Sequence, residues 1–316
     1  MTEATAPGKI ILFGEHAVVY GRPAIAAPLM QVRAEATVEA SDGMTLDLWL
    51  PDLGERYQAG LTWAAVSETT PPLLSAVRYV QRYLGGMALP ALRLTVRSAI
   101  PIAGGLGSGA ATAAALIRAL LRHLGDSAEN ATVCDLTYAV ECLHHGTPSG
   151  IDNTVVSYEQ PVFFLRRPGN NLVQPFITGR PLHLIIGDTG VRSETKGVVA
   201  DVRRQWQADP ATFEMLFDRC GHIAHAAHAA LAEGDPAHLG RLMNENQRVL
   251  QAMTVSNPAL ERLIEAALRA GALGAKLSGA GRGGNMIALV TPEQLDPVEM
   301  ALRQVGAVRT WRTSLG

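Results

Sequence analysis

A glycine-rich segment at residues 101–111, with the sequence PIAGGLGSGAA, leads directly into the apolar run TAAALIRALL at residues 112–121. Four glycines remove side-chain bulk where a turn enters a helix: Gly104, Gly105, Gly107 and Gly109. Free backbone N–H groups and the positive end of the helix dipole then face one anion. The pattern is typical of phosphate binding, although a tight strand-to-helix turn without a ligand has a similar composition.

Three further motifs carry ionisable or glycine-rich positions. They are APGKIILFGEHAVVYG at residues 6–21, HGTPSGIDN at 145–153 and KLSGAGRGGN at 276–285. The second motif places Asp152 on a Pro/Gly/Ser turn, where a carboxylate accepts a proton, orients a hydroxyl or caps a helix. Glu141 precedes Asp152 on a predicted helix and is by itself a typical solvated glutamate. His16 alone is more often a packed histidine than a ligand.

Together and in this order, the four motifs resemble those of the GHMP kinase superfamily, over nearly the whole chain from Ala6 to about Val290. The motifs at residues 6–21 and 145–153 are most similar to the mevalonate kinase family. The resemblance implies transfer of the γ-phosphoryl group of ATP to the 5-hydroxyl of mevalonate, with ATP and Mg²⁺ as cofactors. It also implies a homodimer, as is frequent among relatives.

The resemblance also implies a role for individual residues. Asp152 is the expected catalytic base, paired with Lys9, and Glu141 and Ser108 are the expected metal ligands. The expected ATP-binding residues are Pro101, Gly104, Gly105, Leu106, Gly107, Ser108, Gly109 and Ala110. The expected substrate-binding residues are Glu15, His16, Thr195, Ser278 and Gly279. The motif at residues 276–285, called the third glycine motif or third glycine loop below, is expected to pack beside the phosphate loop at residues 101–111.

Two positions depart from the family pattern. Gly109 stands where mevalonate kinases usually have a serine that contributes to metal binding. The remaining ligands for Mg²⁺ are then Glu141, phosphate oxygens and water. The hydroxyl of Ser108 or Thr112 is a candidate to replace the missing one. Arg282 stands where the third loop usually has glycine. An arginine there either reaches a nucleotide phosphate or points to solvent.

Several alternatives belong to the same superfamily or fold. Phosphomevalonate kinases tend to have Glu-Tyr where this chain has Glu15-His16, and the first motifs of galactokinase and homoserine kinase differ from that at residues 6–21. An ATP-dependent decarboxylase of mevalonate diphosphate usually has an Ile-Lys-Tyr-Trp-Gly-Lys run, which is absent. A non-catalytic protein on the kinase fold has no need for the charges of Lys9, Glu141 and Asp152 together.

Composition excludes other classes. The net charge is −2, with 27 basic and 29 acidic residues and no basic run, so a nucleic-acid partner is not expected. No targeting segment or membrane-length apolar stretch is present in the sequence, which predicts a cytoplasmic protein without a membrane partner. The three cysteines have no CxxC spacing, so we expect free, buried thiols. We interpret His222, His225 and His228 as a polar helix face rather than a metal site.

Strands are predicted at residues 9–13, 24–32, 35–39, 44–50, 92–96, 162–165, 182–187, 274–278 and 285–290. Helices are predicted at 72–84, 107–123, 131–144, 196–206, 210–234, 238–253 and 257–270. This order favours an α+β fold. The resemblance implies the two-domain GHMP kinase fold: a ribosomal protein S5 domain 2-like N-terminal domain at 1–175 that binds ATP and a ferredoxin-like C-terminal domain at 176–316 that completes the substrate site.

Overall fold

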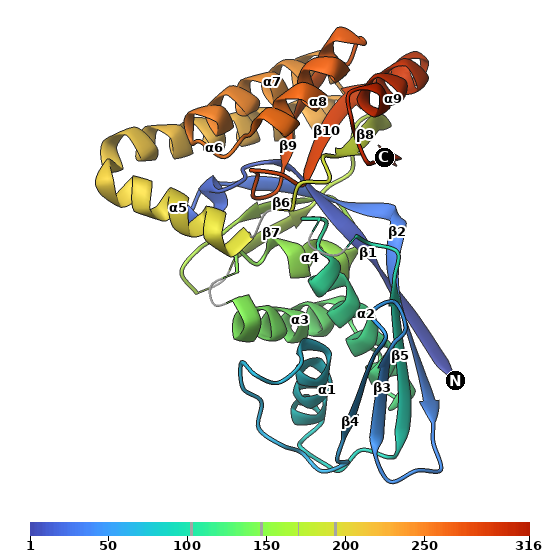
Figure 1. The fold of residues 1–316 in the computed structure, drawn as a ribbon. Helices are drawn as coiled ribbons and strands as arrows, with labels where there is room; N and C mark the ends of the chain where they lie inside the picture. The colour runs from blue at the N-terminus through green and yellow to red at the C-terminus, as the bar shows by residue number, and fades with distance from the viewer. Residues whose placement is uncertain (102–103, 146–147, 170, 193–194) are drawn as a thin grey trace. The chain divides into compact units, whose positions relative to one another are not determined.

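The computed structural model describes residues 1–101, 104–145, 148–169, 171–192 and 195–316. It is a mixed α+β structure with two sheets, which confirms the predicted fold class (Figure 1). Contacts between residues group the chain into two compact units. The first unit contains residues 1–9, 28–102 and 107–159, and the second contains residues 10–27, 103–106 and 160–316.

Five strands contribute to the first unit: β1 (Thr2–Phe13), β2 (Ala24–Ala40), β3 (Leu46–Leu50), β4 (Glu55–Ala59) and β5 (Leu92–Ser98). β5 is antiparallel to the second half of β2 and parallel to β3, and β4 is antiparallel to β3. The two strands predicted at 24–32 and 35–39 are one continuous strand, because Arg33 and Ala34, which the prediction left out, keep the extended backbone, and Ala34 pairs with Ser98 of β5. β4 was not predicted, because its sequence ERYQA carries little apolar signal.

Four helices complete the first unit: α1 (Pro72–Tyr83), α2 (Ser108–His123), α3 (Asn130–His145) and α4 (Ile151–Tyr158). α2 is buried on all sides over residues 113–121, as expected for an Ala- and Leu-rich run. The prediction missed α4, since a helix of eight residues has too little periodicity to be distinguished from the turn before it. Gly146 and Thr147 of that turn lie outside the described residues.

The second unit holds the remaining strands: β6 (Val162–Leu165), β7 (Leu172–Pro175), β8 (Leu182–Asp188), β9 (Gly274–Ser278), β10 (Asn285–Val290) and β11 (Arg309–Leu315). β6 pairs with the start of β2, and β7 pairs with β6. The other four strands form an antiparallel sheet in the order β11-β8-β10-β9. This order, with helices in the two crossovers, is the ferredoxin-like arrangement. β7 and β11 were not predicted.

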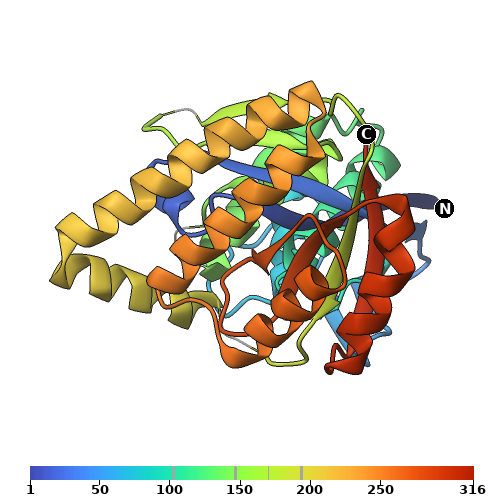
Figure 2. The ribbon, with the colours of Figure 1, turned by 90° about the horizontal axis from the view of Figure 1, so that it is seen from above.

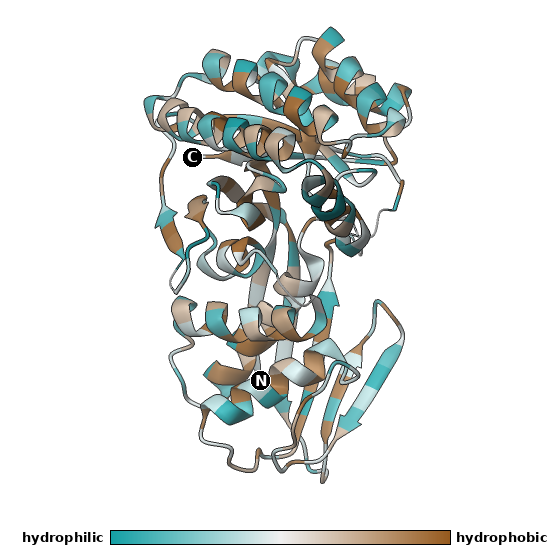
Figure 3. Ribbon diagram, turned by 90° about the vertical axis from the view of Figure 1, so that its left-hand side faces the viewer, coloured by the Kyte–Doolittle hydropathy of each residue, from teal (hydrophilic) through white to brown (hydrophobic). Residues whose placement is uncertain are grey.

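Helices of the second unit are α5 (Thr195–Ala208), α6 (Pro210–Glu233), α7 (Pro236–Ala252), α8 (Pro258–Arg269) and α9 (Leu295–Gln304), with short 3₁₀ turns at Ala17–Tyr20 and Pro292–Gln294. α9 was not predicted. α7, α8 and α9 pack on the four-stranded sheet, and α6 lies beside α7 (Figures 1 and 2). Polar and apolar residues share these helices, as the teal and brown colours in Figure 3 show. Their apolar sides form the core of the unit, for example Leu260, Leu263 and Ile264 of α8.

Three of these helices begin with the same local signal. Asp209, Asp235 and Asn257 each precede a proline, and each side chain accepts a hydrogen bond from the backbone N–H three residues later. An acidic or amide side chain satisfies an N–H group that has no partner within the helix, and proline fits the first helical position because it needs no donor. The starts of α6, α7 and α8 therefore follow from the sequence.

Candidate active site

Lys9 and Asp152 meet in the first unit, as the sequence predicted. Lys9 comes from β1 and Asp152 from the first turn of α4, and Lys9 Nζ lies 3.2 Å from Asp152 Oδ1. The lysine side chain is only 5% exposed, whereas that of the aspartate is 33% exposed. A buried ammonium needs a counter-charge. The pair therefore gives the buried lysine its counter-charge and leaves the carboxylate partly exposed.

The glycine loop passes close to this pair. Gly107 has φ +75°, and a Cβ atom on it would lie 2.8 Å from Lys9 Cγ. A side chain at this position would therefore displace the lysine and would strain the backbone. Helix α2 starts at the next residue, and its first internal hydrogen bond runs from Ala111 N to Gly107 O. The N–H groups of residues 108–110 have no partner within the helix, which is the geometry of an anion site.

Glu141, on α3, lies near the start of α2. A Cβ atom on Gly109 would be 3.6 Å from Glu141 Oε1, which is ordinary contact. Burial, and to a smaller extent the charge of Asp152, raise the pKa of Glu141 to about 7 against the opposing charge of Lys9. Two carboxylates that repel each other in a partly buried site are stabilised by a divalent cation, and carboxylate oxygens are the donors that Mg²⁺ prefers. These residues fit a magnesium ion.

The two hydroxyl groups considered for the metal differ in their bonding. Thr112 Oγ1 donates to the carbonyl oxygens of Ser108 and Gly109, at 3.0 and 2.9 Å, so its proton is used within the helix. Ser108 is the first residue of α2 and is half-buried.

The other expected ATP-binding residues differ in burial. Pro101 is half-buried, whereas the Leu106 and Ala110 side chains are buried. Leu106 and Ala110 can thus offer a ligand only their backbone.

In the second unit, His16 follows β1 and has φ +61°, an uncommon backbone conformation for a residue other than glycine. Its Nε2 donates to the Ala280 carbonyl at 2.9 Å. Burial, with a smaller contribution from the charge of Arg282, lowers the pKa of His16 to about 4 against the opposing effect of the hydrogen bond to Ala280. The imidazole is therefore neutral at physiological pH, and its proton is on Nε2.

Glu15 forms a fully buried ion pair with Lys276 of β9. Lys276 Nζ also donates to the Leu277 carbonyl at 2.6 Å. Burial lowers the pKa of the lysine, and the charge of Glu15 opposes that shift. The motif resemblance implies that Glu15 contacts substrate and gives no role to Lys276. The missed signal is a lysine inside a buried strand, where a counter-charge is required.

The third glycine motif packs against the phosphate loop, as predicted. Asn285 Nδ2 donates to the Gly104 carbonyl, and a Cβ atom on Gly279 would lie 3.8 Å from Gly105 O. Ser278 Oγ accepts from Ile11 N at 3.0 Å and donates to Ile11 O at 2.9 Å. This hydroxyl therefore joins β9 to β1.

Two further expectations concern the second unit. Thr195 is exposed at the start of α5. Arg282 does not point freely to solvent, because its guanidinium pairs with Asp201 on α5 and donates to Thr254 O at 3.1 Å. A contact of Arg282 with a nucleotide phosphate stays a prediction.

Histidines and cysteines do not assemble a metal centre among the described residues. His225 and His228 pack their rings against Phe163, at centroid distances of 5.3 and 4.8 Å. Of the three cysteines, all free, Cys134 and Cys220 are buried and Cys142 is half-buried. Across the described part of the chain, no helix is both long and apolar enough to span a bilayer.

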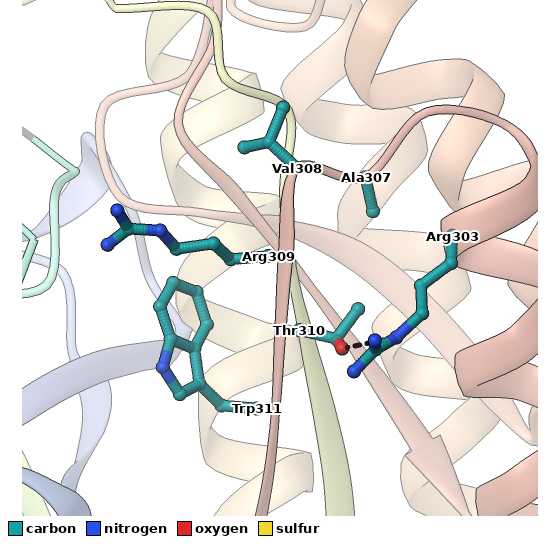
Figure 4. A pocket seen from close by; sticks show the side chains of 6 residues that line it. All are labelled: Arg303, Ala307, Val308, Arg309, Thr310 and Trp311. Atoms are coloured by element: carbon teal, nitrogen blue, oxygen red, sulfur yellow. Dashed lines mark hydrogen bonds between the residues drawn. The ribbon is translucent and has the colours of Figure 1, made fainter.

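A hollow of about 290 Å³ lies beside β11, and no predicted site residue lines it. Its lining consists of Arg303, Ala307, Val308, Arg309, Thr310 and Trp311 (Figure 4). Arg303 donates from Nε to Thr310 Oγ1 at 3.1 Å and from Nη2 to Glu299 Oε1 at 2.7 Å, so its positive charge is already paired within the protein. Figure 4 shows Arg309 and Trp311 on the other side of the strand from Arg303.

Comparison with known families agrees with this geometry. The model of the GHMP kinases N terminal domain matches residues 72–160, and that of the GHMP kinases C terminal matches residues 227–308. The chain belongs to the GHMP kinase family.

Comparison with individual relatives places the chain in a narrower group within the GHMP kinases. The mevalonate kinase of Thermococcus onnurineus strain NA1 is 36% identical over 317 residues, which cover 96% of this chain and 93% of that protein. A crystal structure of L. major mevalonate kinase in complex with R-mevalonate matches with a TM-score of 0.80 and 30% identity, over 100% of this chain and 96% of that one. Within the GHMP kinases, the chain therefore belongs with the mevalonate kinases.

A Streptococcus pneumoniae phosphomevalonate kinase, in complex with phosphomevalonate and AMPPNP, has a TM-score of 0.84 but only 17% identity, over 99% of this chain and 100% of that one. This likeness shows the common fold alone.

Proposed function

We propose that the protein transfers the γ-phosphoryl group of ATP to the 5-hydroxyl of mevalonate, a step of isoprenoid precursor synthesis. The observation that carries the proposal is the 3.2 Å contact of Lys9 Nζ with Asp152 Oδ1, in a unit where α2 begins beside Lys9 at Gly107. Phosphoryl transfer needs a positioned acceptor, a cation and a phosphate cradle. The relatives named mevalonate kinase support mevalonate as the acceptor.

In the proposed reaction, the oxygen of the mevalonate hydroxyl attacks the γ-phosphorus and the hydroxyl proton passes to Asp152. The bond between the γ-phosphorus and the bridging oxygen breaks, and ADP leaves. Lys9 holds Asp152 in place through their ion pair and offsets negative charge on the transferring group. The backbone N–H groups at the start of α2 hold phosphate oxygens, as does the loop formed by Pro101 and residues 104–107.

We assign Glu141 and Ser108 as the protein ligands of Mg²⁺. When bound with ATP, the ion supplies positive charge to the phosphate oxygens. A cation bound there would keep Glu141 ionised despite its raised pKa of about 7. With glycine at position 109, water would take the place of a further side-chain ligand.

We propose that His16 and Thr195 bind mevalonate. Ser278 and Gly279 support the backbone that leads to Ala280, the hydrogen-bond partner of His16. His16 is neutral, and its Nε2 is committed to Ala280, so its Nδ1 is the atom left to accept a hydrogen bond from a hydroxyl. Glu15 acts by fixing the turn before His16, because its carboxylate is buried against Lys276.

The test is ADP release by purified protein with ATP and Mg²⁺, with mevalonate, phosphomevalonate, mevalonate diphosphate, galactose and homoserine as separate acceptors. We expect turnover with mevalonate and a product heavier by one phosphate. Turnover with phosphomevalonate alone would move the protein to the next kinase step. Nucleotide binding without turnover on any acceptor would favour a non-catalytic protein.

We further propose domains at residues 1–175 and 176–316, a cytoplasmic location and a homodimer. Each matched family model lies within one of the proposed domains. Light scattering on the purified chain tests the dimer, since the two states differ twofold in mass.

A further inference from the structure

Helix α5 has few buried apolar side chains. Of its fourteen residues, only Val198 and Val202 are buried, and near the end of the helix the half-buried Trp206 packs on Tyr20 and donates to Glu214 of α6. The two valines lie on one side of the helix, four residues apart. A helix with so narrow an apolar stripe depends on other contacts for its position.

Polar contacts supply this anchoring along the neighbouring stripe, at Asp201 and Gln205. Asp201 pairs with Arg282. Gln205 Nε2 donates to Thr254 Oγ1 at 3.1 Å, and the Thr254 hydroxyl donates to Gln205 Oε1 at 3.2 Å. Arg282 also donates to Thr254 O from Nε, at 3.1 Å, and to Val255 O from its backbone N–H, at 2.7 Å. A weak contact of 3.5 Å joins Arg282 Nη2 to Thr254 Oγ1.

Both residues at the centre of this network have a strained backbone. Arg282 has φ +55° and Thr254 has φ +59°. The left-handed region is uncommon for residues with a side chain and especially unfavourable for a β-branched residue. Glycine would relieve this strain at position 282, so the arginine is explained by what its side chain binds.

The loop that carries Arg282 is also the loop that receives His16. Ala280, two residues before Arg282, accepts the His16 Nε2–H at 2.9 Å. The positive charge of Arg282 also helps to lower the pKa of His16. The loop therefore contacts a substrate-side residue directly and holds, through Arg282, the helix that begins with Thr195.

We infer that Arg282 is a positioning residue: by binding Asp201 and Thr254, it fastens α5 to the third glycine loop and so fixes Thr195 relative to His16. This inference rests on the proposed function, in which both residues serve mevalonate binding. Arg282 contacts neither substrate nor nucleotide in this role. It sets affinity for the acceptor, and the affinity for ATP is independent of it.

Arg282→Gln is the principal test, and Arg204→Gln is its matched control. Arg204 is also paired with Asp201, but it lies on α5 itself and does not reach the loop. We expect Arg282→Gln to raise KM for mevalonate roughly 3- to 10-fold, the size of effect that a partly exposed ion pair and one charged hydrogen bond allow. The kcat, the KM for ATP and the melting temperature should stay near the wild-type values, and Arg204→Gln should change none of these quantities.

Two further variants connect the effect to the geometry. Arg282→Lys keeps the charge but lacks the fork that reaches Asp201 and the Thr254 carbonyl together, so its KM should be intermediate. Asp201→Asn should reproduce part of the KM increase, and the double variant Asp201→Asn/Arg282→Gln should be no worse than Arg282→Gln alone, because both changes break one contact.

Hydrogen exchange separates this inference from the proposed function, because it needs no substrate. We expect faster exchange of the α5 amides in Arg282→Gln than in Arg204→Gln. Equal exchange in the two variants would overturn the inference even if mevalonate is the substrate. Faster exchange with an unchanged KM for mevalonate would also overturn it. If wild-type protein does not turn over mevalonate, the proposed function fails, and the exchange result still decides whether Arg282 holds α5.

Discussion

Lys9 and Asp152 form an ion pair whose two partners differ in exposure: the lysine side chain is 5% exposed and that of the aspartate is 33% exposed, with 3.2 Å between Nζ and Oδ1. The lysine is held by the fold around it, including Gly107. The carboxylate, in contrast, keeps an open side. This asymmetry suits a base that must receive a proton from outside the protein.

Asp152→Asn should lower kcat by about 10²- to 10⁴-fold, since an amide cannot accept the proton. Nucleotide affinity should change little, because the phosphate-binding N–H groups of α2 remain in place. Steady-state ADP release and equilibrium binding of a fluorescent ATP analogue measure the two quantities. Asp135→Asn, at an exposed position of α3, is the control. A kcat of Asp152→Asn equal to that of this control would exclude Asp152 from catalysis.

Glu141 should make the metal-free protein less stable as pH rises. Its folded pKa of about 7 lies above the ordinary value of 4.5, so the folded state binds the proton more tightly. The stability contributed by the protonated group is fully present below pH 4.5 and is lost as pH rises through 7. Glu141→Gln should therefore be more stable than wild type at pH 8, by at most about 3 kcal/mol, and equal to it at low pH.

Urea unfolding in EDTA at both pH values measures this difference, and the exposed Glu68→Gln is the control. With ATP added, Mg²⁺ should stabilise wild type more than Glu141→Gln, because a carboxylate ligand is lost. The assignment of Glu141 to the metal fails if Mg²⁺ stabilises the two proteins equally.

Substitution of two glycines at the start of α2, Gly107 and Gly109, should change stability in opposite directions. Gly107→Ala places a Cβ atom 2.8 Å from Lys9 Cγ at a φ of +75°, so we expect a loss of activity and of roughly 1 kcal/mol or more of stability. Gly109→Ser meets only Glu141 Oε1, at 3.6 Å, and should gain a few tenths of a kcal/mol, about the difference in helix propensity.

The added serine hydroxyl should also tighten metal binding, measured as the Mn²⁺ concentration that half-saturates the ATP complex in electron paramagnetic resonance. Gly109→Ala is the matched variant without a hydroxyl and should gain stability but no metal affinity. Equal metal affinity of the serine and alanine variants would contradict a role for this position beside the ion.

His16 should make the protein sensitive to acid. Its folded pKa of about 4 lies below the ordinary value of 6.5, so its contribution to stability is complete above pH 6.5 and is lost as pH falls towards 4. His16→Asn should remove this loss, at most about 3 kcal/mol, because asparagine tolerates the left-handed backbone and does not titrate. Unfolding free energies at pH 7 and 4.5, compared with the exposed His222→Asn, test this; parallel curves would contradict it.

Glu15 and Lys276 should be costly to separate. Lys276→Met leaves a buried carboxylate without its cation, and we expect a loss of about 3 to 5 kcal/mol. Glu15→Leu/Lys276→Met together should recover a large part of that loss, since no charge then remains buried. Thermal and urea unfolding measure both variants. The exposed Arg269→Gln, which breaks a pair with Glu265, should stay near zero. A double variant no more stable than Lys276→Met would show that packing, rather than charge, dominates.

The sequence by itself determined the features that depend on neighbouring residues. Glycines before an Ala- and Leu-rich run predicted the loop and helix α2, and Asp-Pro and Asn-Pro pairs mark the starts of α6, α7 and α8. The order of the motifs was sufficient to predict the family, and the resemblance to that family was sufficient to predict the Lys9–Asp152 pair. These succeed because backbone conformation and short motifs are encoded within a few residues.

Only the tertiary structure decided which distant groups meet. Lys276 with Glu15, Ser278 with Ile11 and Arg282 with Asp201 join segments far apart in the chain. The partner of a charged or polar side chain depends on how strands and helices pack, and a local pattern does not contain that information. For the same reason the sequence could not assign Arg282, whose neighbours are all glycine or small residues, to a helix that starts at Thr195.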